Sequence, residues 1–265
     1  MKSSYLIEVI SYEDIKDNPK IHQFSVRSKY FVNSVIIETS KNLIIFDAQQ
    51  DEGSAKELIN YANKLNKPIE RLIISHAHID HYAGMPAFKN IPTYSSKEVI
   101  ADFKSKSIES KYIPEFELKK SFKIDDINFE MANIKNAHCP NHIVLWIKEL
   151  EVVLAGDLAQ YKGHLLAYNY DSFIAGLQLI AEKSVNYNTL ITGHGAITNT
   201  LTLIENINYL IECKQIYLDS LSEEEFDRVV REKFVNRSKI RANMGLLLNN
   251  PHWDRLNRHI KISKG

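Results

Sequence analysis

The sequence is poor in the features that mark secreted, disulfide-stabilised or membrane-spanning chains. Only two cysteines occur, Cys139 and Cys213, in 265 residues, so a disulfide framework is excluded as the means of stabilisation. No stretch approaches the roughly 18 consecutive apolar residues of a spanning helix. The apolar run near the start is interrupted by Glu8 and is not followed by a small-residue cleavage site, so we do not interpret it as a signal peptide. We therefore expect a cytoplasmic protein without membrane contact.

An excess of one charge sign is also absent. Lysine plus arginine equals aspartate plus glutamate, 33 each, which gives a formal net charge of zero. A strongly basic domain is the usual sign of a nucleic-acid partner, so none is expected. Composition is that of an ordinary soluble protein, with 44% apolar and 25% charged residues. Because no linker or repeat divides the chain, we predict one domain over 1–265, of which 201–265 is a helical C-terminal extension.

Short apolar runs alternate along the chain with segments of helical periodicity. Leu43–Phe46, for example, is a run of four apolar residues, whereas 54–65 places its apolar residues on one helical face. Such alternation predicts α/β layers. We expect strands over 21–26, 31–39, 43–46, 71–75, 122–124, 127–134, 143–148, 152–155 and 189–192, and helices over 54–65, 98–103, 172–183, 201–219 and 222–234.

A dense cluster of metal-binding side chains directly follows one of these strands. The segment Ser75-His76-Ala77-His78-Ile79-Asp80-His81 carries three histidines and one aspartate. Imidazole nitrogen and carboxylate oxygen are the standard donors to zinc. A polar surface loop with incidental histidines is the alternative, and this density disfavours it.

Three later residues of the same chemical types each follow an apolar strand. His138 comes after 127–134, Asp157 after 152–155, and His194 after 189–192. A single histidine in such a place is usually an ordinary surface group. Three strands that each deliver a donor near the carboxyl end predict instead a shared metal site.

In their order and spacing these motifs resemble the metallo-β-lactamase-fold hydrolases. That family carries His-x-His-x-Asp-His, then a histidine in a Gly-His-Thr-Pro-Gly-like turn, a bridging aspartate and a Gly-His-Gly-like turn. Here the corresponding segments are His76–His81, Ala137–His142, Gly156-Asp157 and Gly193–Gly195. The resemblance implies a four-layer αββα sandwich, in which two mixed sheets lie face to face with helices outside.

The resemblance also implies a dinuclear metal centre and a hydrolytic reaction. The first metal would be held by His76, His78 and His138, the second by Asp80, His81 and His194, with Asp157 bridging them. Zinc is the expected metal, with iron or manganese as alternatives. A metal-bound hydroxide would then cleave a small ester, thioester or lactone, and Asp80 would help to orient it.

Several residues near the ligand positions carry further expectations. Cys139 replaces the family's usual threonine, and we expect a buried side chain rather than a soft metal donor. Asn141 replaces glycine and is expected to adopt the left-handed backbone conformation. His142 could orient a ligand or be purely structural. Tyr161 and His164 follow the bridging aspartate, and each could donate a hydrogen bond to a developing oxyanion or lie in an ordinary surface loop.

Further functions remain open on the same fold. These are a phosphodiesterase or nuclease, a β-lactam hydrolase, a mononuclear-iron sulfur dioxygenase and a non-catalytic metal-binding protein. The lack of an apparent export signal argues against β-lactams, which are met outside the cytoplasm. The expected partner is a small-molecule substrate. The C-terminal helices could wall the substrate pocket or form a homodimer contact.

Overall fold

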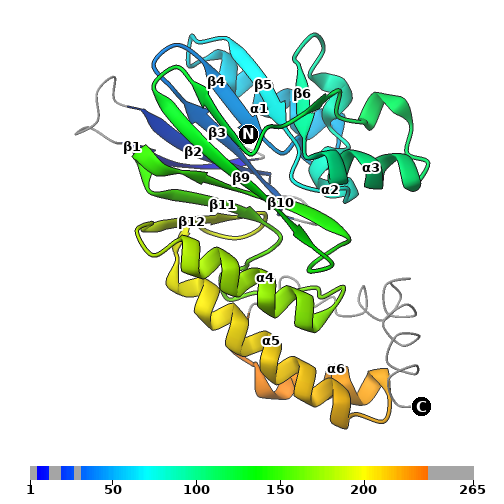
Figure 1. Cartoon of the computed structure of the whole chain (residues 1–265). Helices are drawn as coiled ribbons and strands as arrows, with labels where there is room; N and C mark the ends of the chain where they lie inside the picture. Colours follow the sequence, from blue (N-terminus) through cyan, green and yellow to red (C-terminus); the bar gives the residue numbers. More distant parts are fainter. Residues whose placement is uncertain (1–4, 12–18, 27–30, 238–265) are drawn as a thin grey trace.

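The computed structural model describes residues 5–11, 19–26 and 31–237. Two β-sheets lie against each other in the middle, one group of helices covers the upper sheet, α4 and α5 cover the lower one, and α6 packs on α5 (Figure 1). This is the predicted four-layer αββα sandwich, which is confirmed.

The first sheet joins an antiparallel part to a parallel part. Its strands lie in sequence order: β1 (Tyr5–Ser11), β2 (Lys20–Val26), β3 (Asn33–Glu38), β4 (Leu43–Phe46), β5 (Ile69–Ile73), β6 (Thr93–Ser95) and β7 (Phe116–Glu117). Pairing is antiparallel from β1 to β4 and parallel from β4 to β7. Because parallel strands end at the same edge, the residues that follow β4 and β5 are brought together.

The helices of the first half are α1 (Glu52–Asn63), α2 (Ile79–Tyr82) and α3 (Lys97–Ser105), with 3₁₀ turns η1 (Met85–Ala87) and η2 (Ser110–Tyr112). Asp51 is the N-cap of helix α1, and its carboxylate accepts a hydrogen bond from the backbone N–H of Ser54 at 2.8 Å. Its residues Ala55, Leu58 and Ala62 are buried at helical spacing. Helix α3 is capped in the same way by Ser96.

The second sheet is mostly antiparallel. It contains β8 (Ser121–Ile124), β9 (Ile127–Lys135), β10 (Asn141–Ile147), β11 (Val152–Gly156), β12 (Thr189–Thr192) and β13 (Thr198–Asn199), in the spatial order β13-β12-β11-β10-β9-β8. The 3₁₀ turn η3 (Lys148–Leu150) joins β10 to β11, which pair as an antiparallel hairpin. Among the described strands of this second sheet, β11 and β12 are the one parallel pair, which places the residues that follow them side by side.

Three helices form the outer layer of the second half: α4 (Tyr170–Lys183), α5 (Leu201–Asp219) and α6 (Glu223–Lys233). Ser222 and Glu225 are spaced as in a capping box, and at the start of α6 the Ser222 hydroxyl accepts from the Glu225 N–H at 3.2 Å. The Glu225 carboxylate bonds the N–H of Leu221 at 2.8 Å rather than that of Ser222. Of the predicted extension over 201–265, the part from 238 onward lies outside the described residues. No helix in the described ranges is long and apolar enough to cross a membrane.

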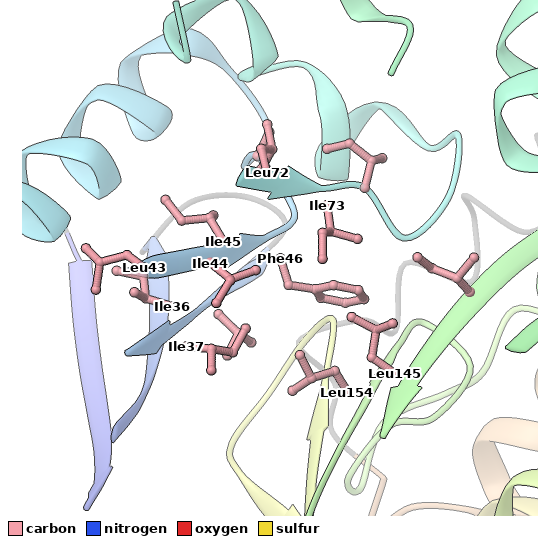
Figure 2. Close-up of a cluster of buried hydrophobic side chains, with 14 of the residues drawn as sticks. Ile36, Ile37, Leu43, Ile44, Ile45, Phe46, Leu72, Ile73, Leu145 and Leu154 are labelled. Carbon is pink, nitrogen blue, oxygen red and sulfur yellow. The ribbon is translucent and has the colours of Figure 1, made fainter. Parts of the chain in front are cut away.

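The main apolar core fills the space between the sheets. Figure 2 shows Ile37, Phe46 and Ile73 of the first sheet on the side that faces Leu145 and Leu154 of the second. Strand β10 is buried on both faces, since Leu145 enters this core while its neighbour Trp146 enters a second apolar cluster beneath α4 and α5. Strands packed on both sides are rigid, so the loops at their ends start from fixed positions.

Candidate metal centre

The side chains predicted as metal ligands converge where the two sheets meet. Two groups of donor atoms form, and within each group the atoms lie within 4.8 Å of one another. The first group contains His76, His78, His138 and Asp157, and the second contains Asp80, His81 and His194. His78 is the N-cap of α2, while Asp80 and His81 belong to that helix. The remaining members lie in loops after β5, β9, β11 and β12.

Asp157 lies between the two groups. Its Oδ2 is 3.5 Å from Nε2 of His138, and its Oδ1 is 3.3 Å from Nε2 of His81 and 3.1 Å from Nε2 of His194. One carboxylate oxygen therefore faces each group. This is the geometry that a bridging ligand requires.

The donor atoms have the chemistry of a metal site. The His76 side chain is fully buried, yet its Nε2 makes no hydrogen bond with any described residue, and Asp157 Oδ1 has only the close contacts with His81 and His194 given above. Buried polar atoms are nearly always hydrogen-bonded, so these exceptions need an explanation. Metal ions at the two groups would take up these lone pairs, and imidazole with carboxylate suits zinc. The residues therefore fit a pair of metal ions.

Burial keeps three of the histidines in the neutral form that binds metal, whereas neighbouring carboxylates favour the protonated form of His81. Burial lowers the pKa of His76, His78 and His138, so these rings are neutral at pH 7. For His81, burial disfavours the charged form, but the carboxylates of Asp157, Asp80 and Asp47 outweigh it and raise the pKa. For Asp157, burial favours the neutral acid, but the positive charges of His194 and His81 outweigh burial and lower the pKa.

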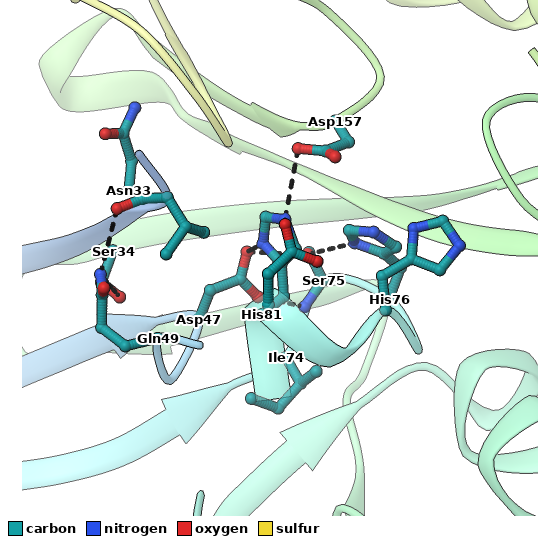
Figure 3. Close-up of polar contacts among 12 residues, drawn as sticks. Asn33, Ser34, Asp47, Gln49, Ile74, Ser75, His76, His81 and Asp157 are labelled. Atoms are coloured by element: carbon teal, nitrogen blue, oxygen red, sulfur yellow. Dashed lines mark hydrogen bonds and ion pairs between the residues drawn. The ribbon is translucent and has the colours of Figure 1, made fainter. Parts of the chain in front are cut away.

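Asp47 holds both ends of the segment from Ser75 to His81 in place (Figure 3). It follows β4 with a positive φ of 66°. Its Oδ1 accepts from the Ser75 N–H at 2.7 Å, and its Oδ2 accepts from the Ser75 hydroxyl and from Nδ1 of His81, each at 2.8 Å. Because Nδ1 of His81 donates to Asp47, its Nε2 is left to face Asp157. Nδ1 of His76 lies 2.8 Å from the Ser75 hydroxyl, which likewise directs Nε2 of His76 into the site.

His142 supports the backbone that carries Asp157. Its Nδ1 donates to the carbonyl of Ile143 at 2.8 Å, and its Nε2 accepts from the Asp157 N–H at 3.1 Å. The ring stacks on His76, with centroids 4.3 Å apart. Gly156, with a φ of +50°, must be a glycine, since a Cβ there would lie 2.5 Å from the His142 ring. Of the two roles expected for His142, the geometry favours orientation of a neighbouring ligand.

Residues 27–194 match the family model described as the metallo-beta-lactamase superfamily. The chain belongs to the metallo-β-lactamase superfamily. Its curated relatives include the metallo-beta-lactamases type 2 of Bacillus sp. (strain 170), 24% identical over 186 residues, and of Elizabethkingia meningoseptica, 26% identical over 215 residues. These matches cover 67% and 74% of this chain, and 72% and 85% of the relatives.

Solved structures of the superfamily share the fold. TMB-1 superposes with a TM-score of 0.65 at 17% identity, over 78% of this chain and 98% of that one. A metallo-beta-lactamase from Pontibacter korlensis gives 0.65 at 18% identity, over 77% and 99%. Family membership, predicted from the motifs, is thus confirmed, and the chain is a metallo-hydrolase of this superfamily.

This superfamily member departs from the usual motif at Cys139 and Asn141, and the two expectations for these residues have different outcomes. Cys139 is buried, its thiol donates to the carbonyl of Asn141 at 3.1 Å, and burial raises the pKa of the thiol. The expectation that Asn141 adopts a left-handed conformation is wrong, because Asn141 is the first residue of β10 and the positive φ falls on Asn136, at 52°. The Asn141 amide instead donates to Asp102 at 2.9 Å.

The two predicted oxyanion donors of this metallo-hydrolase lie in different surroundings, and neither belongs to the donor groups. His164 is 5% exposed, and its Nδ1 is 2.8 Å from the hydroxyl of Tyr209 on α5. Tyr161 is half-buried, and its carbonyl oxygen lies 3.9 Å from the place that a Cβ on Gly195 would occupy. Tyr161 is therefore close to the turn that carries His194, whereas His164 packs towards the helical layer.

Proposed function

We propose that this metallo-hydrolase cleaves a small ester, thioester or lactone with two zinc ions bound at the paired donor groups. The observation that carries the proposal is Asp157, whose two carboxylate oxygens face separate sets of histidines at 3.1–3.5 Å. When bound, such ions lower the pKa of a coordinated water to about 7 and polarise a substrate carbonyl. Iron and manganese are the alternative metals.

The roles of the chain's own residues follow from their positions. His76, His78 and His138 would hold the first ion, and Asp80, His81 and His194 the second, with Asp157 shared. Asp47 and His142 would keep the rings and the shared carboxylate oriented without touching the substrate.

Asp80 has a further role in this proposal. Its side chain is 17% exposed, against 0% for His81 and 3% for His194, so it is the member of its group most open to solvent. Burial raises its pKa, but His81 and His194 outweigh burial and lower it. The ionised carboxylate can therefore accept a hydrogen bond from the attacking water and orient it towards the carbonyl.

A β-lactam is the second candidate substrate. It is favoured by the curated relatives, which are metallo-beta-lactamases. The amide carbonyl of a β-lactam requires the same attack by an activated water as an ester does. No comparable observation favours a phosphodiesterase or nuclease, a sulfur dioxygenase or a non-catalytic metal-binding protein. A small-molecule substrate, a cytoplasmic location and a homodimer stay predictions.

Metal analysis and a substrate panel test the proposal. The purified chain should hold up to two zinc ions, and the zinc-loaded protein should hydrolyse at least one ester, thioester, lactone or β-lactam. The same panel should include a phosphodiester, and Asp80→Ala serves as the inactive reference. Turnover of the phosphodiester alone would replace the proposed substrate class. Absence of bound metal after growth in zinc-replete medium would refute the metal centre itself.

A further inference from the structure

The loop over 158–169 connects the shared aspartate to α4 and touches the metal centre at its far end. The Leu166 carbonyl accepts a hydrogen bond from Nδ1 of His138 at 3.0 Å. Two residues on, the Tyr168 N–H donates to the carbonyl of Ala137 at 2.7 Å. With its Nδ1 held by the loop, the His138 ring turns Nε2 towards Nδ1 of His78, 2.9 Å away. The position of the loop therefore sets the orientation of one candidate ligand.

Helix α5 holds the middle of this loop through a buried amide. Asn206, which is fully buried, accepts from the Gln160 N–H at 2.8 Å and donates to the Gln160 carbonyl at 3.0 Å. Both main-chain groups of one loop residue are thus bonded by one side chain. These two hydrogen bonds fix the distance between the loop and α5, because a displaced loop would leave the buried amide and the main-chain groups of Gln160 unpaired.

A second anchor comes from the residues that follow α6. The Arg237 guanidinium donates to the carbonyl of Gly163 at 2.6 Å and lies 4.0 Å above the ring of Tyr209. Tyr209 in turn bonds Nδ1 of His164. Between the two anchors, Lys162 adopts a positive φ of 51°, a conformation that persists only where its surroundings impose it.

Both anchors lie beyond residues 27–194, which match the superfamily. We propose that Asn206 and Arg237 are positioning residues of the metal centre: they hold the loop over 158–169 so that Leu166 orients His138. The helical extension thereby serves the metal centre as a support for the loop that follows the shared aspartate. The part of this inference that concerns zinc rests on the proposed function, whereas the orientation of His138 does not.

The test compares anchor variants with matched controls of the same residue types on α5 and α6. Asn206→Ala and Arg237→Ala each remove one anchor. Asn208→Ala on α5 and Arg228→Ala on α6 change the same residue types at exposed positions. In the zinc-free full chain, the His138 Nδ1–H proton should be protected from solvent exchange and visible by NMR. It should lose that protection in both anchor variants and keep it in both controls.

Zinc affinity, measured by competition with a chelator, is the second readout. Loss of a group that orients a ligand typically weakens metal binding by about 10–100-fold, so the anchor variants should bind zinc at least about tenfold more weakly than the controls. Arg237→Lys, which keeps a donor, should recover part of the loss. Should Asn206→Ala fail to fold, Arg237→Ala decides alone. Unchanged His138 protection in the folded anchor variants overturns the inference, as does control-like zinc affinity. A wild-type chain that binds no zinc refutes the proposed function instead, and the NMR comparison still decides whether the anchors orient His138.

Discussion

Gly193 offers the sharpest test of the shared carboxylate, because a methyl group there would occupy the space that Asp157 uses. A Cβ on Gly193 would lie 2.1 Å from Oδ1 of Asp157 and 2.9 Å from Cε1 of His81. Non-bonded carbon and oxygen atoms rest more than about 3 Å apart. In Gly193→Ala the carboxylate must therefore move by about 1 Å, or the backbone bonded to Gly156 and Asn33 must shift instead.

Either response separates Asp157 from the two histidine groups. A displacement of about 1 Å can cost about 10²-fold in turnover, and a disturbed ligand shell about 10–100-fold in metal affinity. We expect Gly193→Ala to bind zinc at least about tenfold more weakly, as measured by chelator competition. Gly53→Ala, at an exposed position in α1, is the matched control and should leave zinc binding unchanged. Equal zinc affinity in the two variants would refute the assignment of Asp157 as the shared ligand.

Three further predictions concern single side chains. His78→Ala and Asp80→Ala should abolish hydrolysis and weaken zinc binding while far-UV circular dichroism stays native; near-normal turnover in either would contradict the ligand assignment. Tyr161→Phe should lower turnover by about 10²–10³ without loss of metal if its hydroxyl stabilises an oxyanion, and full activity would return it to an ordinary loop role. Burial lowers the pKa of His164 to about 4, so as pH falls from about 6.5 to 4 the unfolded chain takes up a proton that the folded chain does not. The free energy of unfolding should then fall by up to about 3 kcal/mol. In His164→Gln the loss of unfolding free energy between pH 7 and pH 4.5, measured by urea titration, should be smaller than in the wild type. An equal loss in the two proteins would contradict this role of His164.

The periodicity of apolar residues is sufficient to predict the long helices and strands. The motifs themselves are sufficient to predict the order of the candidate ligands along the chain. Helix α5 covers 201–219 as predicted, since apolar residues recur along its whole length. Strands β6 and β7 were not predicted, because three and two residues are too short to show an alternating pattern. The sequence predicts a left-handed residue at Asn141, whereas the positive φ lies five residues earlier at Asn136, because loop backbone angles depend on where β10 begins.

The contacts that orient the ligands could not be read from the sequence. Asp47 bonds Ser75 and His81 across 28 and 34 residues, and that meeting depends on β4 lying parallel to β5. An aspartate directly after a buried strand was the available signal, but it does not reveal a partner. The bond from His164 to Tyr209 likewise depends on how α5 packs, which periodicity alone does not determine.

The candidate ligands come from both halves of the sandwich, and this division affects the stability of the protein against unfolding and proteolysis. His76, His78, Asp80 and His81 belong to the first half, whereas His138, Asp157 and His194 belong to the second. Metal ions at this seam would act as cross-links between the halves and would bind the folded chain far better than the unfolded one. At free zinc about 1,000 times the dissociation constant, such linkage adds about 4 kcal/mol to the free energy of unfolding. The amount of this protein that survives proteolysis in a cell would then follow the supply of zinc.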